Sequence, residues 1–351
     1  KKMPQFQTFD QDDRIIETTK VTTGYFSDGG GILMGSDMVT TSLTASQEQY
    51  YVNIRKGTST FDEFSCTFGN RDGSGSSDVT GHTKAIYQYY ADLVLFPDEI
   101  ETIGFQFNSG STENNIFVIS AERARMKDRL NRKNWTLTFS GSKADGSGAK
   151  IELTDDSAYS VATPTPAGNR YNIISGTLGV AGHLNASASM YAANHPYGYI
   201  YPNLGLVILD GTAMSASIPG VAAESGSSVT AFGGVGVGFG LDTATTAKNH
   251  KKLYHTLKSG SFQARSEEDQ ITTSYFVRAR AAHWNFSNNP SFYSGSDATF
   301  AVREFTGNPQ TFITTIGLHD AQGTCVAVGR LSTPVLKNFS TEFTAKVNLV
   351  H

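Results

Sequence analysis

The chain has 351 residues, of which 28 are Lys or Arg and 32 are Asp or Glu, so its formal net charge is −4. Charged residues make up 17% of the sequence, against roughly 25% in ordinary soluble proteins. The mildly acidic balance excludes the electrostatic footprint of a general nucleic-acid binder, and no apolar run is long enough to predict a membrane span. The two cysteines, Cys66 and Cys325, indicate neither a disulfide framework nor a zinc site.

Most of the chain has the pattern of strands, because β-branched and aromatic residues recur at period two between Gly, Asn, Asp and Pro. In chain order, the predicted strands are 15–23, 49–55, 63–68, 102–108, 115–120, 135–139, 170–176, 204–209, 228–232, 261–265, 274–281, 312–318, 325–331 and 343–350. Helices are predicted over 83–96, 121–131 and 243–258. The expected fold class is mainly β with a few inserted helices (α+β), arranged as β-sandwich or mixed-sheet domains with long loops.

Two stretches of small and polar residues, 141–168 and 211–228, suggest domain boundaries. We therefore expect an N-terminal β-rich domain over 1–169 that contains helix 83–96, a Gly-rich middle region over 170–259 and a C-terminal β domain over 260–351. The absence of a repeat of fixed period argues against a propeller or solenoid. Residues 1–20 are expected to form an arm that becomes ordered against a partner.

A glycine run in the middle region predicts close packing. Glycine occupies every second position from Gly234 through Gly236 and Gly238 to Gly240. No register gives G-x-G-x-x-G, and no Lys-Ser or Lys-Thr follows, so a phosphate-binding loop is poorly supported. A strand with one face bare of side chains lets another backbone approach closely, so we expect Gly234, Gly236 and Gly238 at an inter-subunit contact, with a ligand cradle as the weaker alternative.

The strongest charge run is residues 123–133, which contain Arg123, Arg125, Lys127, Arg129, Arg132 and Lys133. On the predicted helix these cations form a solvated face or, with an acidic partner, a salt-bridged contact between subunits; nucleic acid is the least favoured partner. A second candidate contact is the aromatic segment 284–293, in which Trp284 and Phe286 have large areas to bury. Packing on a sheet or a neighbouring subunit is favoured there over stacking on a sugar.

The sequence contains no motif that predicts a catalytic, metal or cofactor site. The eight histidines show no HExxH or HxH spacing, and no serine stands in G-x-S-x-G. The acidic cluster Glu267-Glu268-Asp269 is expected in a solvated turn. Asp10-Gln11-Asp12-Asp13 lacks the Gly and the distal Glu of a calcium loop. We therefore expect a protein that is not an enzyme.

Several strings, taken in order, resemble one family. They are TKAIY at 83–87, ISAERARMK at 119–127 with NWTL at 134–137, YGYIYPNLG at 197–205, YFVRA at 275–279 with NFSNNP at 285–290, TFITTIGL at 311–318 and VAVGRLSTP at 326–334. This series is similar to virion structural proteins of contractile-tailed bacteriophages, especially those that infect cyanobacteria and other aquatic bacteria. The matches extend from about residue 80 to the C-terminal end, and the resemblance rests on their order.

The resemblance implies a tail or baseplate component located in the virion and synthesised in the host cytoplasm, with no catalytic residues to carry over. Its partners would be other virion proteins of the baseplate, tail tube or sheath, or neck, and further copies of itself in a symmetric assembly. A chain poor in charge suits permanent interfaces, whose centres are depleted of charged residues. One alternative is a receptor- or carbohydrate-binding module on the tail or capsid surface, and another is a cell-wall hydrolase carried on the tail.

Overall fold

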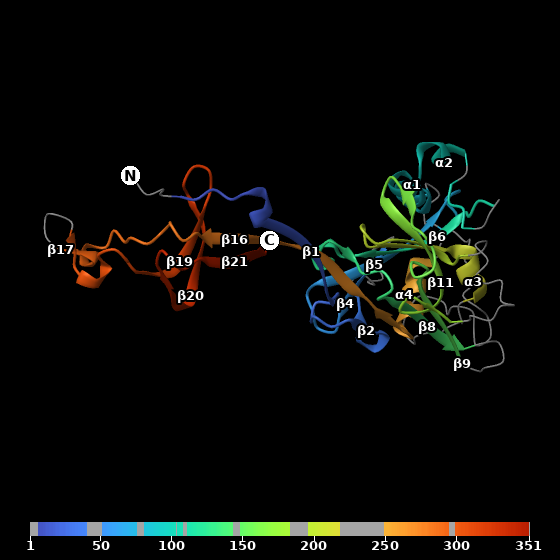
Figure 1. Cartoon of the computed structure of the whole chain (residues 1–351). Coiled ribbons are helices and arrows are strands. Elements are labelled where there is room, and N and C mark those ends of the chain that lie inside the picture. The colour runs from blue at the N-terminus through green and yellow to red at the C-terminus, as the bar shows by residue number, and fades with distance from the viewer. Residues whose placement is uncertain are drawn as a thin grey trace. The chain divides into compact units, whose positions relative to one another are not determined.

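The computed structural model describes residues 6–40, 51–75, 81–102, 104–107, 111–142, 148–182, 196–217, 249–294 and 299–350. Strands dominate these residues and helices are few, which confirms the mainly β class (Figure 1). The chain forms two compact units: unit 1 comprises residues 1–20 and 269–351, and unit 2 comprises residues 21–268. Strands β1 (Arg14–Gly24) and β16 (Arg265–Ala279) each begin in one unit and end in the other.

Unit 2 is built on one large antiparallel sheet. In space its strands follow the order β2-β15-β8-β9-β11-β13-β14-β6-β5-β4-β3, and the short strands β10 and β12 pair with β11. The bounds are β2 (Ile32–Met34), β3 (Met38–Val39), β4 (Tyr51–Lys56), β5 (Asp62–Asn70), β6 (Asn115–Ala121), β8 (Thr136–Ser142), β9 (Gly148–Asp155), β10 (Thr163–Thr165), β11 (Gly168–Thr177), β12 (Val180–Ala181), β13 (Gly198–Tyr201), β14 (Leu206–Asp210) and β15 (Ser261–Gln263). The helices of the unit are α1 (His82–Val94), α2 (Pro97–Thr102), α3 (Gly211–Ser217) and α4 (Asn249–Lys258).

This sheet closes on itself, because its first and last strands are consecutive parts of one bent segment. β2 pairs with β15 and β3 pairs with β4, and only the 3-10 turn η2 (Gly35–Asp37) separates them. At the bend, the Gly35 N–H donates to the Gly260 carbonyl at 2.8 Å. A Cβ on Gly35 would lie 2.2 Å from the Lys258 carbonyl oxygen, so the approach of the bend to the end of α4 requires glycine.

The larger apolar core lies within the closed sheet. Strands from its whole circumference contribute alternate residues, as expected for period-two side chains, and α4 adds one buried face. These core residues include Phe64, Cys66 and Phe68 from β5, Leu137 and Phe139 from β8, Ile173 from β11, and Leu253, Tyr254 and Leu257 from α4. The helix contacts β4, β5, β8 and β15, so it completes the core beside the bend.

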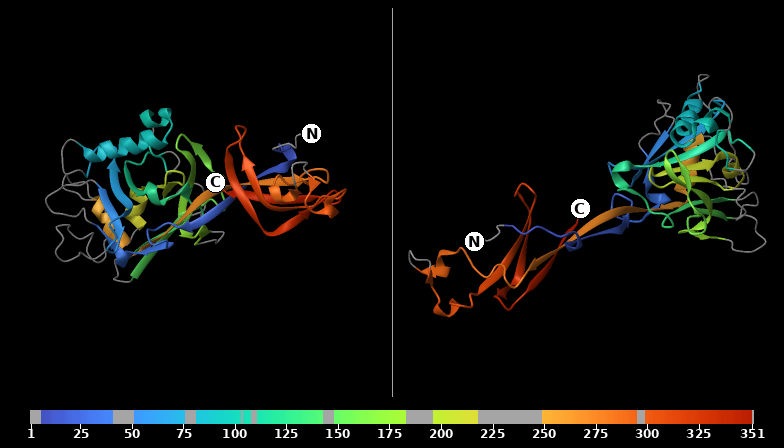
Figure 2. Two further views of the ribbon diagram at one scale, coloured as in Figure 1. Left: turned by 90° about the vertical axis from the view of Figure 1, so that its left-hand side faces the viewer. Right: turned by 45° about the horizontal axis from the view of Figure 1, so that its top comes forward.

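Strands β6 and β14 are buried on both faces. Phe117 and Ile119 belong to the larger core, whereas Ile116 and Val118 belong to a second apolar cluster with Tyr87, Ala91 and Val94 of α1. Figure 2 shows α1 lying alongside the strands of unit 2. Burial on both faces explains why these two strands read as continuous apolar runs rather than as alternating ones.

Unit 1 consists of short antiparallel sheets. β21 (Phe343–Val350) pairs with β16 from Thr272–Val350 to Ala279–Phe343, and β1 pairs with β16 on its other side. β19 (Thr311–His319) and β20 (Cys325–Lys337) form a hairpin, and β17 (Tyr293–Ser294) pairs with β18 (Thr299–Phe300). In the hairpin turn Asp320 N–H donates to the Thr324 carbonyl at 3.0 Å, and Gly323 has a φ of 85°, a left-handed conformation that favours glycine.

The structure corrects two predicted elements. The helix predicted over 121–131 is wrong: after β6 the chain forms the 3-10 turn η3 (Arg123–Arg125), takes a positive φ of 57° at Lys127, and enters β7 (Arg129–Leu130). The strand predicted over 102–108 is also wrong, because α2 ends at Thr102 and residues 104–107 form no strand. The strand predicted at 228–232 and the first part of the helix predicted at 243–258 lie outside the described residues.

The two compact units differ from the three-part division expected from composition. The expected boundary near residue 170 falls inside β11, which pairs with β9 on one side and β13 on the other. The observed boundary between the units is instead crossed twice by the chain, between residues 20 and 21 in β1 and between residues 268 and 269 in β16. The expected N-terminal arm includes part of β1, which is paired with β16.

The two cysteines differ in exposure, and this predicts their reactivity. Cys66 is fully buried, and burial raises the pKa of its thiol, whereas Cys325 is exposed. We expect a maleimide to label one thiol in the native chain and two in the denatured chain, with Cys66 reacting at least about 100-fold more slowly in the native state. Mass spectrometry of labelled peptides measures this, and Cys325→Ser provides the control. Equal labelling rates in the native protein would contradict the placement of Cys66.

Candidate interaction surfaces

The basic segment 123–133 folds against an acidic part of β16. Arg129 Nη2 lies 2.7 Å from Glu267 Oε1. Glu267 is only 6% exposed, and its second carboxylate oxygen accepts a hydrogen bond from Asn131 Nδ2 at 2.8 Å. β7 pairs with β16 at Leu130–Ser266 and Arg129–Glu267, so the backbone ladder fixes the register of this buried ion pair.

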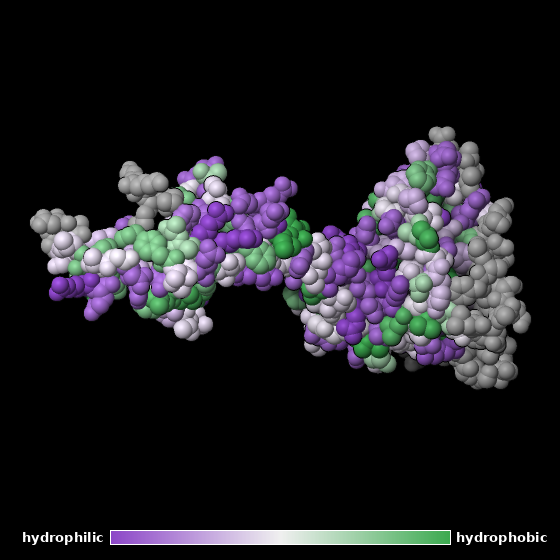
Figure 3. Space-filling view, viewed as in Figure 1, coloured by the Kyte–Doolittle hydropathy of each residue, from purple (hydrophilic) through white to green (hydrophobic). Residues whose placement is uncertain are grey.

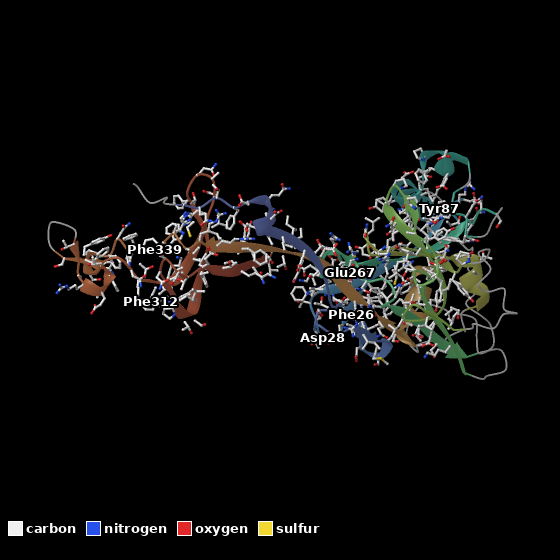
Figure 4. The ribbon with its side chains drawn as sticks, viewed as in Figure 1. Phe26, Asp28, Tyr87, Glu267, Phe312 and Phe339 are labelled. Atoms are coloured by element: carbon white, nitrogen blue, oxygen red, sulfur yellow. The ribbon has the colours of Figure 1, made fainter. Side chains whose placement is uncertain are left out.

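The other cations of the segment named as contact candidates are also engaged within unit 2. Lys127 Nζ lies 3.0 Å from Glu268 Oε2, and the Arg125 guanidinium lies 4.7 Å from the centre of the Phe61 ring. Arg123 donates to the Asp128 carbonyl at 3.0 Å. The solvated turn expected at 267–269 is therefore wrong: these residues lie on β16, and two of them carry the counter-charges of the basic segment (Glu267 is labelled in Figure 4).

The remaining predicted contact residues divide between unit 1 and the part of the chain that is not described. Gly234, Gly236 and Gly238 lie outside the described residues. Trp284 has a positive φ of 59°, and its carbonyl accepts a hydrogen bond from Thr311 Oγ1 at 2.6 Å. The Phe286 ring packs against Phe300 and Phe339, with centroid distances of 6.1 and 6.3 Å. The Phe286 ring is therefore packed within unit 1, and the Trp284 backbone is bonded to β19.

A larger candidate surface in unit 1 is the hairpin outer face, which we define as Phe312, Val326, Val328 and Leu336. Their exposures are 63%, 64%, 64% and 38%. Phe312 lies opposite Leu336 toward one end of the ladder, and Val326 and Val328 are two residues apart toward its other end, so the members of each pair project from the same side of the hairpin. Figure 4 labels Phe312 and Figure 3 shows apolar residues among polar ones on the visible face of unit 1.

Sequence reasoning missed this face although it predicted both strands. In β20 the large residues Val326 and Val328 alternate with the small residues Ala327 and Gly329. An alternating strand is expected to turn its larger apolar residues toward the core. Here they are exposed, and Ala327 and Gly329 lie on the side of buried Leu318 and Ile316. The size order along 326–329 therefore gave no signal of the exposed side, and only the fold reveals it.

The clearest titratable cluster joins Glu113 and Asp210 at the start of α3. Glu113 Oε1 accepts hydrogen bonds from Asn115 N–H at 2.9 Å and Thr212 Oγ1 at 3.0 Å. Burial raises the pKa of Glu113, and the charge of Asp210 raises it further. Asp210 in turn accepts from the Ala213 N–H at 2.8 Å. Within the described residues no group of three or more His, Cys, Asp or Glu side chains is arranged to hold a metal.

Comparison of the chain with protein-family models, curated proteins and solved structures gives no match. In the described part of the chain, no helix has the length and apolar character needed to cross a membrane.

Proposed function

We propose that this protein is a non-enzymatic structural subunit of a bacteriophage virion, a baseplate or tail component in which unit 1 contacts neighbouring subunits. Two features support the proposal: the ordered strings that resemble tail proteins of contractile phages, and the distribution of apolar side chains in unit 1. The second feature carries the argument, because it is independent of the resemblance.

Unit 1 has few apolar side chains in its interior. Among its described residues the buried apolar side chains are Ala279, Phe292, Ile316, Leu318 and Ala345, each 6–9% exposed. Its least exposed side chains are polar: Lys337 at 0%, Asn285 at 1% and Ser274 at 1%. Both apolar core clusters lie in unit 2. Unit 1 therefore gains little from apolar burial within its own described residues.

Large apolar side chains of unit 1 are instead on its surface. At least 36% of the area is exposed for each of Phe6, Phe9, Ile15, Ile16, Ile271, Val302, Phe312, Val326, Val328, Leu336, Phe339 and Val350. Within the described part of the chain β19 and β20 pair with each other and with no other strand, so each of the two strands has an unpaired edge there. Unpaired edges and exposed apolar faces are hazards for a monomer, but they are covered when neighbouring subunits pack on them.

The assignment to a virion tail or baseplate is tested on purified phage particles. Virions of the phage that encodes the chain would be purified, their tails separated from heads, and both fractions analysed by quantitative mass spectrometry. We expect several copies per particle, enriched in the tail fraction. Absence from purified virions would overturn the proposal, and recovery with the heads would overturn the tail or baseplate assignment.

The contact surface is tested by the double substitution Val326→Ser/Val328→Ser on the hairpin outer face. Burial of a Val side chain is worth about 1.5 kcal/mol, so loss of both should weaken a contact by about 3 kcal/mol, or roughly 100-fold in affinity. We expect the variant to be incorporated into particles at least about tenfold less than the unchanged chain.

The matched control is Val161→Ser, because Val161 is 94% exposed in unit 2. This variant should be incorporated normally. Trp284 fluorescence reports whether unit 1 of the double variant keeps its fold, since the other tryptophan, Trp135, lies in unit 2. Normal incorporation of a folded Val326→Ser/Val328→Ser variant would exclude the hairpin outer face as an essential contact.

A further inference from the structure

Among the described residues of unit 1, the most deeply buried charged group is the amine of Lys337, at the end of β20. Its side chain is 0% exposed. Nζ donates three hydrogen bonds, to the Asn285 Oδ1 at 2.8 Å, the Asn338 carbonyl at 2.8 Å and the Ala281 carbonyl at 3.0 Å. All three acceptors are formally neutral. Burial of an amine among neutral oxygens is a costly arrangement in a unit with so little core.

The carboxamide of Asn285 is held against this amine. Asn285 is 1% exposed, and its Nδ2 donates to the Ala281 carbonyl at 2.7 Å, the same oxygen that accepts from Lys337. Because Oδ1 is 2.8 Å from Nζ and a C=O bond is about 1.2 Å long, the amide carbon lies within about 4 Å of the amine. The side-chain nitrogens of both residues therefore meet at one carbonyl oxygen.

Three constraints hold the two side chains in register. Lys337 lies opposite Thr311 in the β19–β20 ladder. Thr311 Oγ1 donates to the carbonyl of Trp284, the residue before Asn285. The following residue, Phe286, packs against the ring of Phe339. An amine and an amide carbon fixed in this way have the proximity that replaces a bimolecular encounter by an intramolecular one.

We propose that Lys337 and Asn285 join in an intramolecular isopeptide cross-link. The amine Nζ attacks the amide carbon Cγ of Asn285, an Nζ–Cγ bond forms, and the Cγ–Nδ2 bond breaks. Nδ2 leaves as ammonia, taking up a proton that Nζ gives up. The reaction neither oxidises nor reduces any group, and it requires no reagent beyond the two side chains.

The surroundings favour this reaction. Attack requires an uncharged amine, and burial lowers the pKa of Lys337, while the charge of Glu342 opposes that effect. Glu342 Oε1 accepts from the Ala281 N–H at 3.4 Å, so a carboxylate contacts the residue whose carbonyl accepts hydrogen bonds from both side chains. Exclusion of water from a buried amine also protects it from other reactions.

A covalent cross-link would also stabilise unit 1, which has few buried apolar side chains. A small unit without a sufficient core needs another source of stability, such as disulfides, a metal or a covalent closure. Cys325 is the only cysteine of unit 1, so no disulfide can form within this unit. A bond from Asn285 to Lys337 would close the chain around the loop after β16 and the whole β19–β20 hairpin. The inference does not depend on the virion proposal.

Intact mass spectrometry of the full chain under denaturing conditions tests the cross-link. We expect a mass below the sequence mass by one ammonia, and a branched peptide in digests that contains both Asn285 and Lys337. Lys337→Arg and Asn285→Ala should each restore the full mass expected for the variant. Denaturation before measurement makes the result independent of whether either variant folds.

Two outcomes would overturn the inference. One is an unchanged chain at its full sequence mass, with unmodified Lys337 and Asn285 recovered in separate peptides. The other is a loss of ammonia that persists in Lys337→Arg, which would place the reaction at another residue. Trypsin provides a further check, because it cleaves after an unmodified lysine at 337 and not after a cross-linked one.

Discussion

Arg129→Ala should lower the free energy of unfolding of unit 2 by about 3–5 kcal/mol, because it leaves the buried Glu267 carboxylate without its counter-charge. Glu267 is 6% exposed, and the Arg129 guanidinium lies 2.7 Å from it, so water cannot simply replace the lost partner. Asn131 still donates to the carboxylate at 2.8 Å, but a neutral donor does not balance a charge. The measurement is urea unfolding followed by Trp135 fluorescence in a Trp284→Phe background.

The matched control is Lys127→Ala, which removes the neighbouring cation of the same segment. Lys127 and Glu268 lie 3.0 Å apart, but their side chains are 51% and 36% exposed, so the loss should be at most about 1 kcal/mol. The double variant Arg129→Met/Glu267→Met should recover most of the stability, since it removes both charges and keeps apolar volume. Equal losses for Arg129→Ala and Lys127→Ala would show that burial of Glu267 does not control the stability of this site.

The predicted elements that proved correct depend on local periodicity. β5, β19 and β21 have alternating patterns over single segments, and α1 has its apolar residues at helical spacing, so all four were predictable. The helix predicted at 121–131 failed because its stabilising partners are distant in sequence. Arg129 is 138 residues from Glu267, and this pairing overrides the helix propensity of the basic run.

The candidate surfaces were less predictable than the fold, for a related reason. Alternation in β20 identifies a strand, but it does not say which side of the strand faces the interior. Only the fold shows that Val326 and Val328 are outside, with Ala327 and Gly329 opposite them. The pairing of Lys337 with Asn285 has no sequence motif, because 52 residues separate them and each looks ordinary in its own segment.

The closure of the unit 2 sheet is likewise a property of the whole chain. β2 and β3 are too short to stand out in the sequence, and β15 has three residues. β15 is nevertheless needed to close the sheet, since it pairs with β2 on one side and β8 on the other. Because β15 forms so few backbone hydrogen bonds, its position depends on the packing of its side chains in the interior of the sheet.

Phe262→Ala should accordingly lower the free energy of unfolding of unit 2 by about 3–5 kcal/mol. Phe262 is the middle residue of β15 and is 2% exposed. Its ring makes edge contacts with Phe64 of β5 and with Phe26, at centroid distances of 5.2 and 5.8 Å. Removal of the ring leaves a cavity between β15 and the strand across the interior, and the short strand cannot move inward without breaking its ladders to Leu33 and Leu137.

Phe61→Ala is the control, because it removes the same ring from the surface of the same unit. Phe61 is 60% exposed, and its main specific contact is the Arg125 guanidinium 4.7 Å from the ring centre, so its loss should cost at most about 1 kcal/mol. Phe262→Leu should fall between the two, with a loss of about 1–2 kcal/mol, since it retains part of the volume. Urea unfolding monitored at Trp135 ranks the three variants. If Phe262→Ala were no more harmful than Phe61→Ala, β15 would be held by its backbone pairing and not by the interior of the closed sheet.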